Sequence, residues 1–133
     1  MQDQRAGVVV RGQFEAVNRR DWTAAMAAYT DDVVLRVPNG LLSGEYRGRD
    51  RVGEWFGDWM RTFRGRIYFD IRDLREAGND VALWAHHTAR GEQSGLELEA
   101  DFFYQFHVRD GKIAFVAFCE TWAEALDTLT GDS

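Results

Sequence analysis

The first half of the chain carries apolar residues at the spacing of amphipathic helices. Val10, Phe14 and Val17 recur at i, i+4 and i+7, which is one face of a helix. Asp21 has the chemistry of an N-cap for a second, short helix. Two further stripes predict a long helix after residue 50 and a short one near the C-terminus. The apolar residues of these three later helices are Trp22, Ala25, Met26 and Tyr29; Val52, Trp55, Phe56, Trp59, Met60 and Phe63; and Trp122, Ala125, Leu126 and Leu129.

The segments between and after these helices show the period of β-strands instead. Strand patterns occur in "DDVVLRV", "RIYFDIRDLREA", "VALWAHHTAR", "LELEADFFYQFHV" and "KIAFVAFCE". The turn sequences "GND", "GEQSG" and "RDG" separate the last four, which predicts consecutive antiparallel hairpins. Helices followed by a run of strands are typical of an α+β domain. We therefore expect a single domain over residues 1–133, with helices on one face of an antiparallel sheet.

The last two predicted strands differ in how their faces are composed. The strand at 96–108 has one face that is apolar except for Tyr104, and this face should be buried. Its inward residues are Ala100, Phe102, Tyr104, Phe106 and Val108, and its outward ones Glu97, Glu99, Asp101, Phe103, Gln105 and His107. The strand at 112–120 is apolar on both faces, so both should be covered. With helices on one side, a homodimer through the outer face is expected, burying Ile113, Phe115 and Ala117 between subunits.

Two adjacent histidines lie in the predicted strand at 81–90 and must point to opposite faces of the sheet. His87 shares its face with small and apolar residues, so we expect it to point inward. His86 shares its face with Trp84 and Arg90 and should point outward. A buried imidazole is either a hydrogen-bonded core group or, in a cavity, an acid or base near neutral pH. The sequence leaves both roles open for His87.

Composition narrows the functional classes further. A net charge of −6 argues against a nucleic-acid-binding surface, which would be basic. No apolar run reaches the ~20 residues of a membrane span, and no secretory signal is visible, so a cytoplasmic location is expected. One cysteine and two diverging histidines leave no metal-ligand pattern, and no cofactor-binding motif is present. Five tryptophans supply large apolar area, for a core or around an organic ligand.

Three segments give the chain a resemblance to a known family: "AVNRRDWTAAMAAYTDDVVLRVPNG" at 16–40, "GEYRGRDRVGEWF" at 44–56 and "FHVRDGKIAFV" at 106–116. In content and order they resemble the SnoaL-like and ketosteroid-isomerase-like branch of the nuclear transport factor 2-like superfamily. The resemblance implies a cystatin-like α+β roll, in which a curved antiparallel sheet wraps a cone-shaped apolar cavity closed at one end by helices. The substrate-binding residues expected for such a cavity are Gln13, Leu35, Val37, Trp55, Trp59, Phe102, Phe106 and Phe118.

The resemblance does not settle the activity, because the family's catalytic positions are filled differently here. Ketosteroid isomerases have a tyrosine, an aspartate base and a second aspartate where this chain has Gln13, Val37 and Tyr104. Valine cannot accept a proton, so steroid isomerisation by the standard mechanism is excluded. Polyketide cyclases of the family have an aspartate near position 101, but Asp101 lies on the face opposite Tyr104 unless a β-bulge reverses it. Glu120 occupies the place of a late family aspartate.

Two functions follow as hypotheses. In the first, the protein binds an apolar or aromatic small molecule and performs cofactor-free acid–base chemistry of the isomerase, cyclase or dehydratase type. His87 is then the base, with a pKa lowered by burial, and Tyr104 and Gln13 donate hydrogen bonds to a substrate oxygen. Asp101 or Glu120 is an acid or orients the histidine. In the second, a non-catalytic ligand-binding or dimeric assembly domain, His87 and Tyr104 bond each other or the backbone and the cavity is small. A pocket of about 300 Å³ or more with convergent polar groups would favour a ligand.

Overall fold

The computed structural model describes residues 5–38, 43–62, 67–90 and 97–130. Within these ranges the chain forms one six-stranded sheet, in the order β2-β1-β6-β5-β4-β3, and four helices. The strands are β1 (Tyr29–Val37), β2 (Gly44–Arg47), β3 (Ile67–Ala77), β4 (Asp80–Arg90), β5 (Glu97–Arg109) and β6 (Lys112–Cys119). The helices are α1 (Ala6–Asn18), α2 (Trp22–Ala27), α3 (Arg49–Thr62) and α4 (Trp122–Thr130). This confirms the predicted α+β class.

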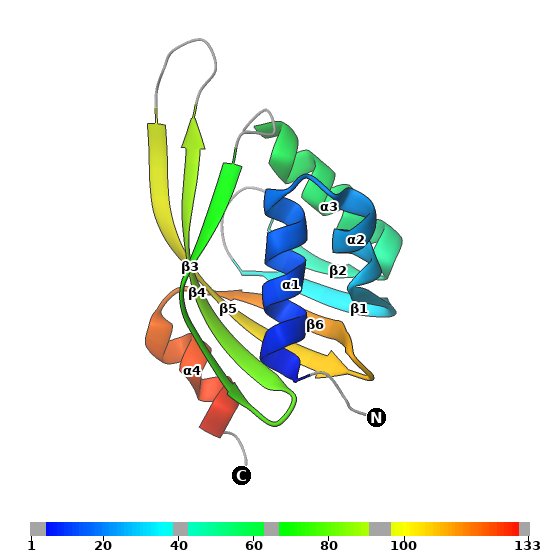
Figure 1. The fold of residues 1–133 in the computed structure, drawn as a ribbon, viewed down its shortest axis with the longest axis vertical. Coiled ribbons are helices and arrows are strands. Elements are labelled where there is room, and N and C mark those ends of the chain that lie inside the picture. The colour runs from blue at the N-terminus through cyan, green and yellow to red at the C-terminus, as the bar shows by residue number, and fades with distance from the viewer. Residues whose placement is uncertain (1–4, 39–42, 63–66, 91–96, 131–133) are drawn as a thin grey trace.

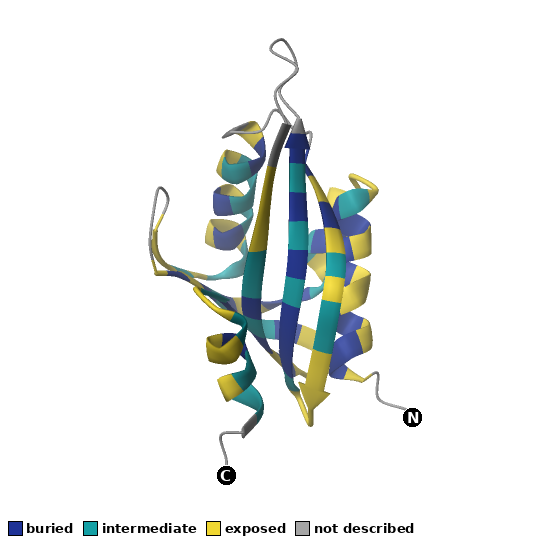
Figure 2. Cartoon of the chain, turned by 90° about the vertical axis from the view of Figure 1, so that its left-hand side faces the viewer, coloured by how far each residue is buried: buried dark blue, intermediate teal, exposed yellow. Residues whose placement is uncertain are grey.

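The sheet is curved, and α1, α2 and α3 lie together on one side of it (Figure 1). Val10, Phe14 and Val17 of α1 are all buried, as their spacing predicted. From Leu83 to Ala89, buried and partly exposed residues alternate along β4, the central strand in the view of Figure 2. The buried set points toward these helices, so one face of the sheet and the apolar stripes of the helices enclose a common interior.

The helices follow the sequence signals closely. Asp21 caps α2 as predicted, because its carboxylate accepts a hydrogen bond from the Ala24 backbone N–H at 3.1 Å.

Among the described residues, none of the helices is long and apolar enough to cross a membrane. Phe63, the "GEQSG" turn and the side chains of Arg90 and Glu97 lie outside the part of the chain that the structure describes.

α4 packs against the outer, convex face of the sheet, whereas helices were expected on one face only. The Trp122 ring centre lies 5.9 Å from that of Trp84 and 6.3 Å from that of Phe103. Trp84 and Phe103 are opposite one another on β4 and β5. Aromatic side chains on the outer face are stabilised when apolar contacts remove them from water, and α4 provides some of these contacts.

The sheet is mixed rather than purely antiparallel, because β1 pairs with β6 in parallel. Leu35 lies opposite Val116, and Val34 opposite Phe115. After β1 the chain forms β2 at the edge of the sheet and then α3. Only the last strand, β6, returns to pair with the other side of β1. Side chains alternate in the same way in parallel and antiparallel strands, so the hydrophobic pattern could not distinguish the two pairings.

A β-bulge in β6 changes which residues reach the outer face. Val108 pairs with Ile113 and His107 with Phe115, so Ala114 is an extra residue on this strand. The extra residue reverses the alternation on one side of it. Ile113 therefore points into the core, where it is fully buried at 0% exposure.

The predicted subunit contact must be corrected accordingly. Ile113 and Ala117 are already buried within the single chain, so the expectation that a second subunit covers them is wrong. Phe115 is the member of that group that stays partly exposed. The Arg36 guanidinium lies 5.3 Å from its ring centre, which covers some of the ring without excluding a partner.

Candidate functional site

His87 and Tyr104 form a buried hydrogen-bonded pair on the concave face of the sheet. β4 and β5 are adjacent and antiparallel, with Leu83 opposite Tyr104 and Ala100 opposite His87. The Tyr104 hydroxyl lies 2.7 Å from His87 Nε2. Both side chains are buried, Tyr104 at 4% and His87 at 3% exposure. His86 points to the convex face, so the orientations predicted from alternation are confirmed.

Aromatic rings enclose the His87 imidazole. The Phe102 ring stacks on it with 4.1 Å between centroids, and the Phe69 ring meets it edge-on at 4.4 Å. The Trp59 ring of α3 lies 5.4 Å away. His87 Nδ1 is buried and has no hydrogen-bond partner among the described residues. One nitrogen of the imidazole is thus bonded, and the other is held without a partner between aromatic rings.

Burial keeps both members of the pair uncharged at neutral pH. Desolvation lowers the pKa of His87 to about 3; repulsion from His86 adds to the effect and the Asp101 carboxylate opposes it. Desolvation also raises the pKa of Tyr104 well above its ordinary range. The lowered pKa expected of His87 is therefore confirmed. In this state the pair is a hydrogen bond between two neutral groups, suited to orienting a ligand.

A second polar pair lies near the first. The Gln13 side chain on α1 donates through Nε2 to the Tyr29 hydroxyl at 3.2 Å. Gln13, Tyr29 and Tyr104 all line an internal void of about 20 Å³, called here the inner void. Such a volume holds about one water molecule. The other walls of the inner void are apolar: Phe14, Val17, Leu35, Val52, Trp55, Phe56, Trp59, Phe69, Phe106, Val116 and Phe118.

Aromatic rings fill most of the interior in which a wide cone-shaped cavity was expected. The Trp55 ring centre lies 5.1 Å from that of Trp59 and 5.6 Å from that of Phe118. These three rings separate the inner void from a larger hollow of about 200 Å³, called here the outer pocket. The outer pocket is lined by Val37, Pro38, Trp55, Trp59, Phe102, Phe118, Cys119 and Glu120. Three rings thus stand between the two volumes, and both volumes are below the about 300 Å³ typical of a ligand pocket.

The residues that were predicted to bind the substrate all line the inner void, the outer pocket or both. Those on the inner void are Gln13, Leu35, Phe106, Trp55, Trp59 and Phe118, and those on the outer pocket are Val37, Phe102, Trp55, Trp59 and Phe118. Glu120 is exposed and lies on the outer pocket, on the other side of the three rings from the inner void. The structure thus brings Gln13 and Tyr104 together at the inner void and leaves Glu120 at the outer pocket.

Asp101 lies on the convex face, apart from His87. Its carboxylate contacts His86 Nδ1 at 2.7 Å, and the Glu99 carboxylate contacts His86 Nε2 at 3.1 Å. The hydrogen bond to Asp101 is the main cause of the raised pKa of His86, and it lowers the pKa of Asp101 in turn. β4 and β5 pair without interruption, so no bulge turns Asp101 inward. The role expected of Asp101, as an acid or orienting group beside His87, does not fit this geometry.

Tyr29 and Phe69 are site residues that sequence reasoning missed. Tyr29 was assigned to the stripe of the second helix, but α2 ends earlier and Tyr29 begins β1. An irregular register between Tyr29 and Val34 hides the alternation that would have identified it. Phe69 could have been found, because Ile67 and Phe69 alternate with exposed residues along β3.

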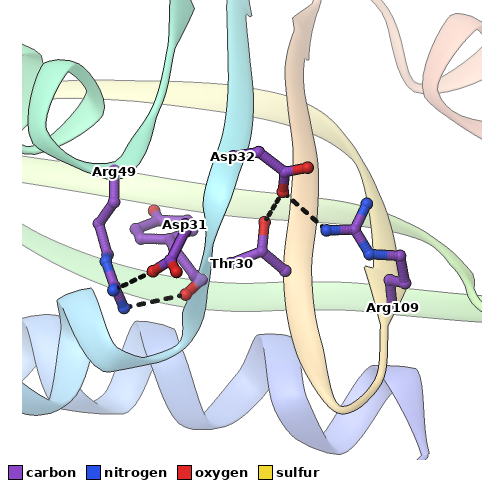
Figure 3. Close-up of polar contacts among 6 residues, drawn as sticks. Thr30, Asp31, Asp32, Arg49 and Arg109 are labelled. Atoms are coloured by element: carbon purple, nitrogen blue, oxygen red, sulfur yellow. Dashed lines mark hydrogen bonds and ion pairs between the residues drawn. The ribbon is translucent and has the colours of Figure 1, made fainter.

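Ion pairs hold the start of β1, where Tyr29 joins the site (Figure 3). Arg49, at the beginning of α3, pairs with Asp31 and donates to the Tyr29 carbonyl oxygen at 3.4 Å. Arg109, at the end of β5, donates to Asp32 at 2.7 Å. Two separate elements are thereby tied to the residues beside Tyr29. Among the described residues, no group of three or more His, Cys, Asp or Glu side chains could hold a metal ion.

Comparison with known proteins agrees with this architecture. A family model described as "SnoaL-like domain" matches residues 10–116. A protein from Xanthomonas campestris, described as having a cystatin-like fold, is 22% identical with a TM-score of 0.77, covering 92% of this chain and 97% of that one. A comparison with curated proteins found no match. The predicted cystatin-like roll is therefore confirmed.

Two other similar structures contain small molecules. TerC, co-crystallised with polyporic acid, is 20% identical with a TM-score of 0.76, covering 93% of this chain and 96% of that one. RV0760c from Mycobacterium tuberculosis, in complex with estradiol-17β-hemisuccinate, is 15% identical with a TM-score of 0.75, covering 89% and 95%. At these identities the likeness concerns the fold.

Proposed function

Because the chain belongs to the SnoaL-like domain family, we propose that it binds an apolar or aromatic small molecule between its helices and the concave face of its sheet. The observation that carries this proposal is the presence of two hydrogen-bonded polar pairs, Gln13–Tyr29 and Tyr104–His87, inside an aromatic interior. Burying polar groups destabilises a fold unless they are fully bonded, and His87 Nδ1 has no partner among the described residues. The small molecules bound by two proteins of similar fold also support an organic ligand.

The ligand gains access to the inner void by moving the wall of three rings. Trp59 is the side chain best placed to move, since it is partly exposed on α3 and lies on both the inner void and the outer pocket. An outward rotation of its indole joins the two volumes and uncovers the imidazole of His87. A ligand that takes the place of the indole packs against Phe69 and Phe102, so we expect it to contain a flat ring system.

Removing the Trp59 indole should therefore strengthen ligand binding. If the closed site opens only in a minor fraction of molecules, Trp59→Ala removes the need for that opening and should lower Kd at least about tenfold. Calorimetric titration with estradiol-17β-hemisuccinate and with polyporic acid measures this effect. Trp84→Ala, the same truncation on the convex face, is the control and should leave Kd unchanged. Unchanged or weaker binding by Trp59→Ala, or the same change in Trp84→Ala, would contradict the proposal.

A second candidate function, cofactor-free acid–base catalysis of the isomerase, cyclase or dehydratase type, is favoured by the 2.7 Å hydrogen bond between Tyr104 and His87. If Nε2 carries the ring proton, it donates to the Tyr104 oxygen and leaves the hydroxyl proton free for a ligand oxygen. Nδ1 then holds an unshared lone pair that can take a proton from a ligand carbon. A pKa of about 3 makes His87 a weak base while the site is closed. Binding is therefore the first function that we propose, and catalysis the second.

We also propose that the protein forms a homodimer through the convex face, now centred on Phe115 rather than on Ile113 or Ala117. Phe115→Glu should convert the dimer to a monomer, because it replaces the apolar ring at the centre of the contact by a charged side chain that is unfavourable to remove from water. Size-exclusion chromatography with light scattering gives the mass directly. Val8→Glu, at an exposed apolar residue of α1, is the matched control. A wild-type monomer, or a Phe115→Glu protein that remains dimeric, would refute this assembly.

A further inference from the structure

A side chain, rather than another strand, bonds the edge of the sheet beside the site. β3 is the outermost strand at one end of the described sheet, next to β4. Main-chain groups on the outer side of such a strand need hydrogen-bond partners from elsewhere. At Phe69 they bond Asn18, the last residue of α1. Asn18 Nδ2 donates to the Phe69 carbonyl oxygen at 2.8 Å, and the Phe69 N–H donates to Asn18 Oδ1 at 2.9 Å.

These two hydrogen bonds determine how Phe69 pairs with β4. The N–H and C=O groups of one strand residue point to the same side, so those of Phe69 point away from β4. Phe69 lies directly opposite His87 in the register of the two strands. The two residues therefore form a non-hydrogen-bonded pair, the kind in which side chains lie closer together. This agrees with the 4.4 Å between the centres of the Phe69 and His87 rings.

The pairing of β3 with β4 is also interrupted close to Phe69. The register shifts between Ile71 and Asp73, where Arg72 is an extra residue on β3. The strand begins at Ile67, so its regular pairing on this side of the bulge covers residues 67–71. Asn18 thus holds the middle of a short segment, at a residue whose own main-chain groups do not bond β4.

Phe69 belongs to the ligand site, and Asn18 supports it from outside. The Phe69 ring lines the inner void and lies 5.9 Å from the Trp59 ring centre and 5.6 Å from that of Phe14. Asn18 is absent from the described residues that line the inner void and the outer pocket. An effect of Asn18 on the site is therefore expected to pass through Phe69.

We propose that Asn18 is a positioning residue of the ligand site, whose amide clamps the Phe69 ring against the His87 imidazole. The clamp keeps water from the imidazole and fixes the wall against which a flat ligand ring packs. Without it, the segment 67–71 loses both hydrogen bonds between Phe69 and α1, and the Phe69 ring moves away from His87. The effect on a ligand rests on the proposed function, whereas the effect on the imidazole concerns the protein without a ligand.

Asn18→Ala removes the clamp without changing any charge. The charged groups that act on His87 are His86 and Asp101, on the other face of the sheet, and both are retained. Burial is the main cause of the low pKa of His87, so loosening the Phe69 wall should raise this pKa to between about 4.5 and 6. A ¹H–¹³C NMR titration between pH 4 and 7 measures the change, because the wild-type imidazole should stay neutral down to pH 4. Absence of a His87 titration above pH 4 in folded Asn18→Ala would overturn the proposal.

Val9→Ala is the control for a general loss of stability. Val9 is a buried residue of the same helix and is absent from the described residues that line the inner void and the outer pocket. It should leave the His87 titration unchanged, and an equal rise of the pKa in Val9→Ala and Asn18→Ala would show that Asn18 is merely structural. If Asn18→Ala fails to fold, Asn18→Ser keeps a short group that can make one of the two hydrogen bonds, and it should give a smaller rise in the same direction. An unchanged titration in that variant would equally refute the clamp.

Combining substitutions tests whether Asn18 acts through Phe69. Phe69→Ala removes the ring and should by itself raise the pKa of His87, because water then reaches the imidazole. Asn18→Ala should add no further rise in the Phe69→Ala background, since two residues that act through one contact are not additive. Additive rises would show that Asn18 reaches His87 by another route and would refute the clamp.

The effect on a ligand is measured separately, so that the clamp and the ligand site can fail independently. The probes are 2-naphthol, which is flat, and 1-adamantanol, which is globular; both are uncharged near pH 7. Asn18→Ala should reduce the preference for 2-naphthol at least about fivefold, because a loosened wall no longer selects a flat ring. Val9→Ala should keep the wild-type preference. Binding of neither probe by wild type would refute the ligand site while the His87 titration still decides the clamp, and an unchanged preference in Asn18→Ala would refute its role in ligand selection.

Discussion

Lowering the pH from 6.5 to 5 is expected to destabilise the folded protein by about 2 kcal/mol through His87. In the folded state, burial lowers the pKa of His87 to about 3, so its imidazole stays neutral throughout this range. In the unfolded chain the same side chain titrates near its ordinary value of about 6.5 and takes up a proton. The unfolded state then binds more protons than the folded one. The free energy of unfolding therefore decreases as the pH is lowered, by about 1.4 kcal/mol per pH unit once the unfolded histidine is protonated.

The other groups with shifted pKa values act outside this window. The pKa of His86 is raised, so its contribution is complete below its unfolded value and is lost as the pH rises through its folded value, above about 6.5. Asp32 and Asp101 have lowered pKa values, so their contributions are lost as the pH falls, below about pH 5. The slope between pH 5 and 6.5 therefore belongs mainly to His87.

Urea unfolding at pH 5.0, 5.75 and 6.5, followed by tryptophan fluorescence, measures this slope. His87→Gln keeps a hydrogen-bonding group opposite Tyr104 but cannot titrate, so its unfolding free energy should hardly change over the window. His86→Gln is the matched control on the opposite face and should keep the wild-type slope. The assignment to His87 is untenable if His87→Gln and wild type lose stability equally as the pH falls.

The faces of β4 and β5 could be predicted from sequence because nothing interrupts their pairing. Side chains alternate strictly along a strand, so the apolar partners of His87 and Tyr104 were sufficient to place both inward. The same alternation placed His86 and Asp101 outward, and the uninterrupted register bears this out. Asp101 is the aspartate that the resemblance to cyclases suggested as an acid. The alternation along the strand was therefore enough to predict that it points away from the interior.

The predictions failed where one local event reverses a pattern or where packing decides. One extra residue, Ala114, turns Ile113 from the outer face into the core, and an alanine in a strand gives no signal of a bulge. Periodicity identifies which faces are apolar but not how large rings share the space between them. It therefore could not show that Trp55, Trp59 and Phe118 close the interior. Tyr29, the polar partner of Gln13, was also missed because of a local irregularity, since the register between β1 and β6 shifts after Tyr29.

His87→Gln should slow proton abstraction from a bound ligand by about two to four orders of magnitude if the Tyr104–His87 pair is catalytic. Isomerisation, aldol-type cyclisation and dehydration share one step, the removal of a proton beside a carbonyl group. That step can be observed without the natural substrate, as deuterium uptake from D₂O by the apolar aromatic ketone 2-tetralone, measured by NMR. The ketone oxygen accepts the Tyr104 proton, and the carbon proton passes to the free lone pair of His87 Nδ1. Tyr104→Phe removes only the hydroxyl and should slow uptake by about two to three orders of magnitude, as loss of one oxyanion donor does.

Stability and binding must be measured on the same variants, because both residues are also part of the core. Tyr104→Phe leaves His87 Nε2 without its partner, which should lower the free energy of unfolding by about 1–3 kcal/mol. A structural role predicts that loss alone, with deuterium uptake per folded molecule unchanged. A catalytic role predicts a slower rate at a Kd for 2-tetralone within a few-fold of wild type, since these groups act mainly on the transition state. Gln105→Leu, on the outward face of β5, is the control and should leave the rate unaltered. If wild type exchanges deuterium no faster than buffer while binding the ketone, the pair serves ligand recognition and the catalytic proposal is wrong.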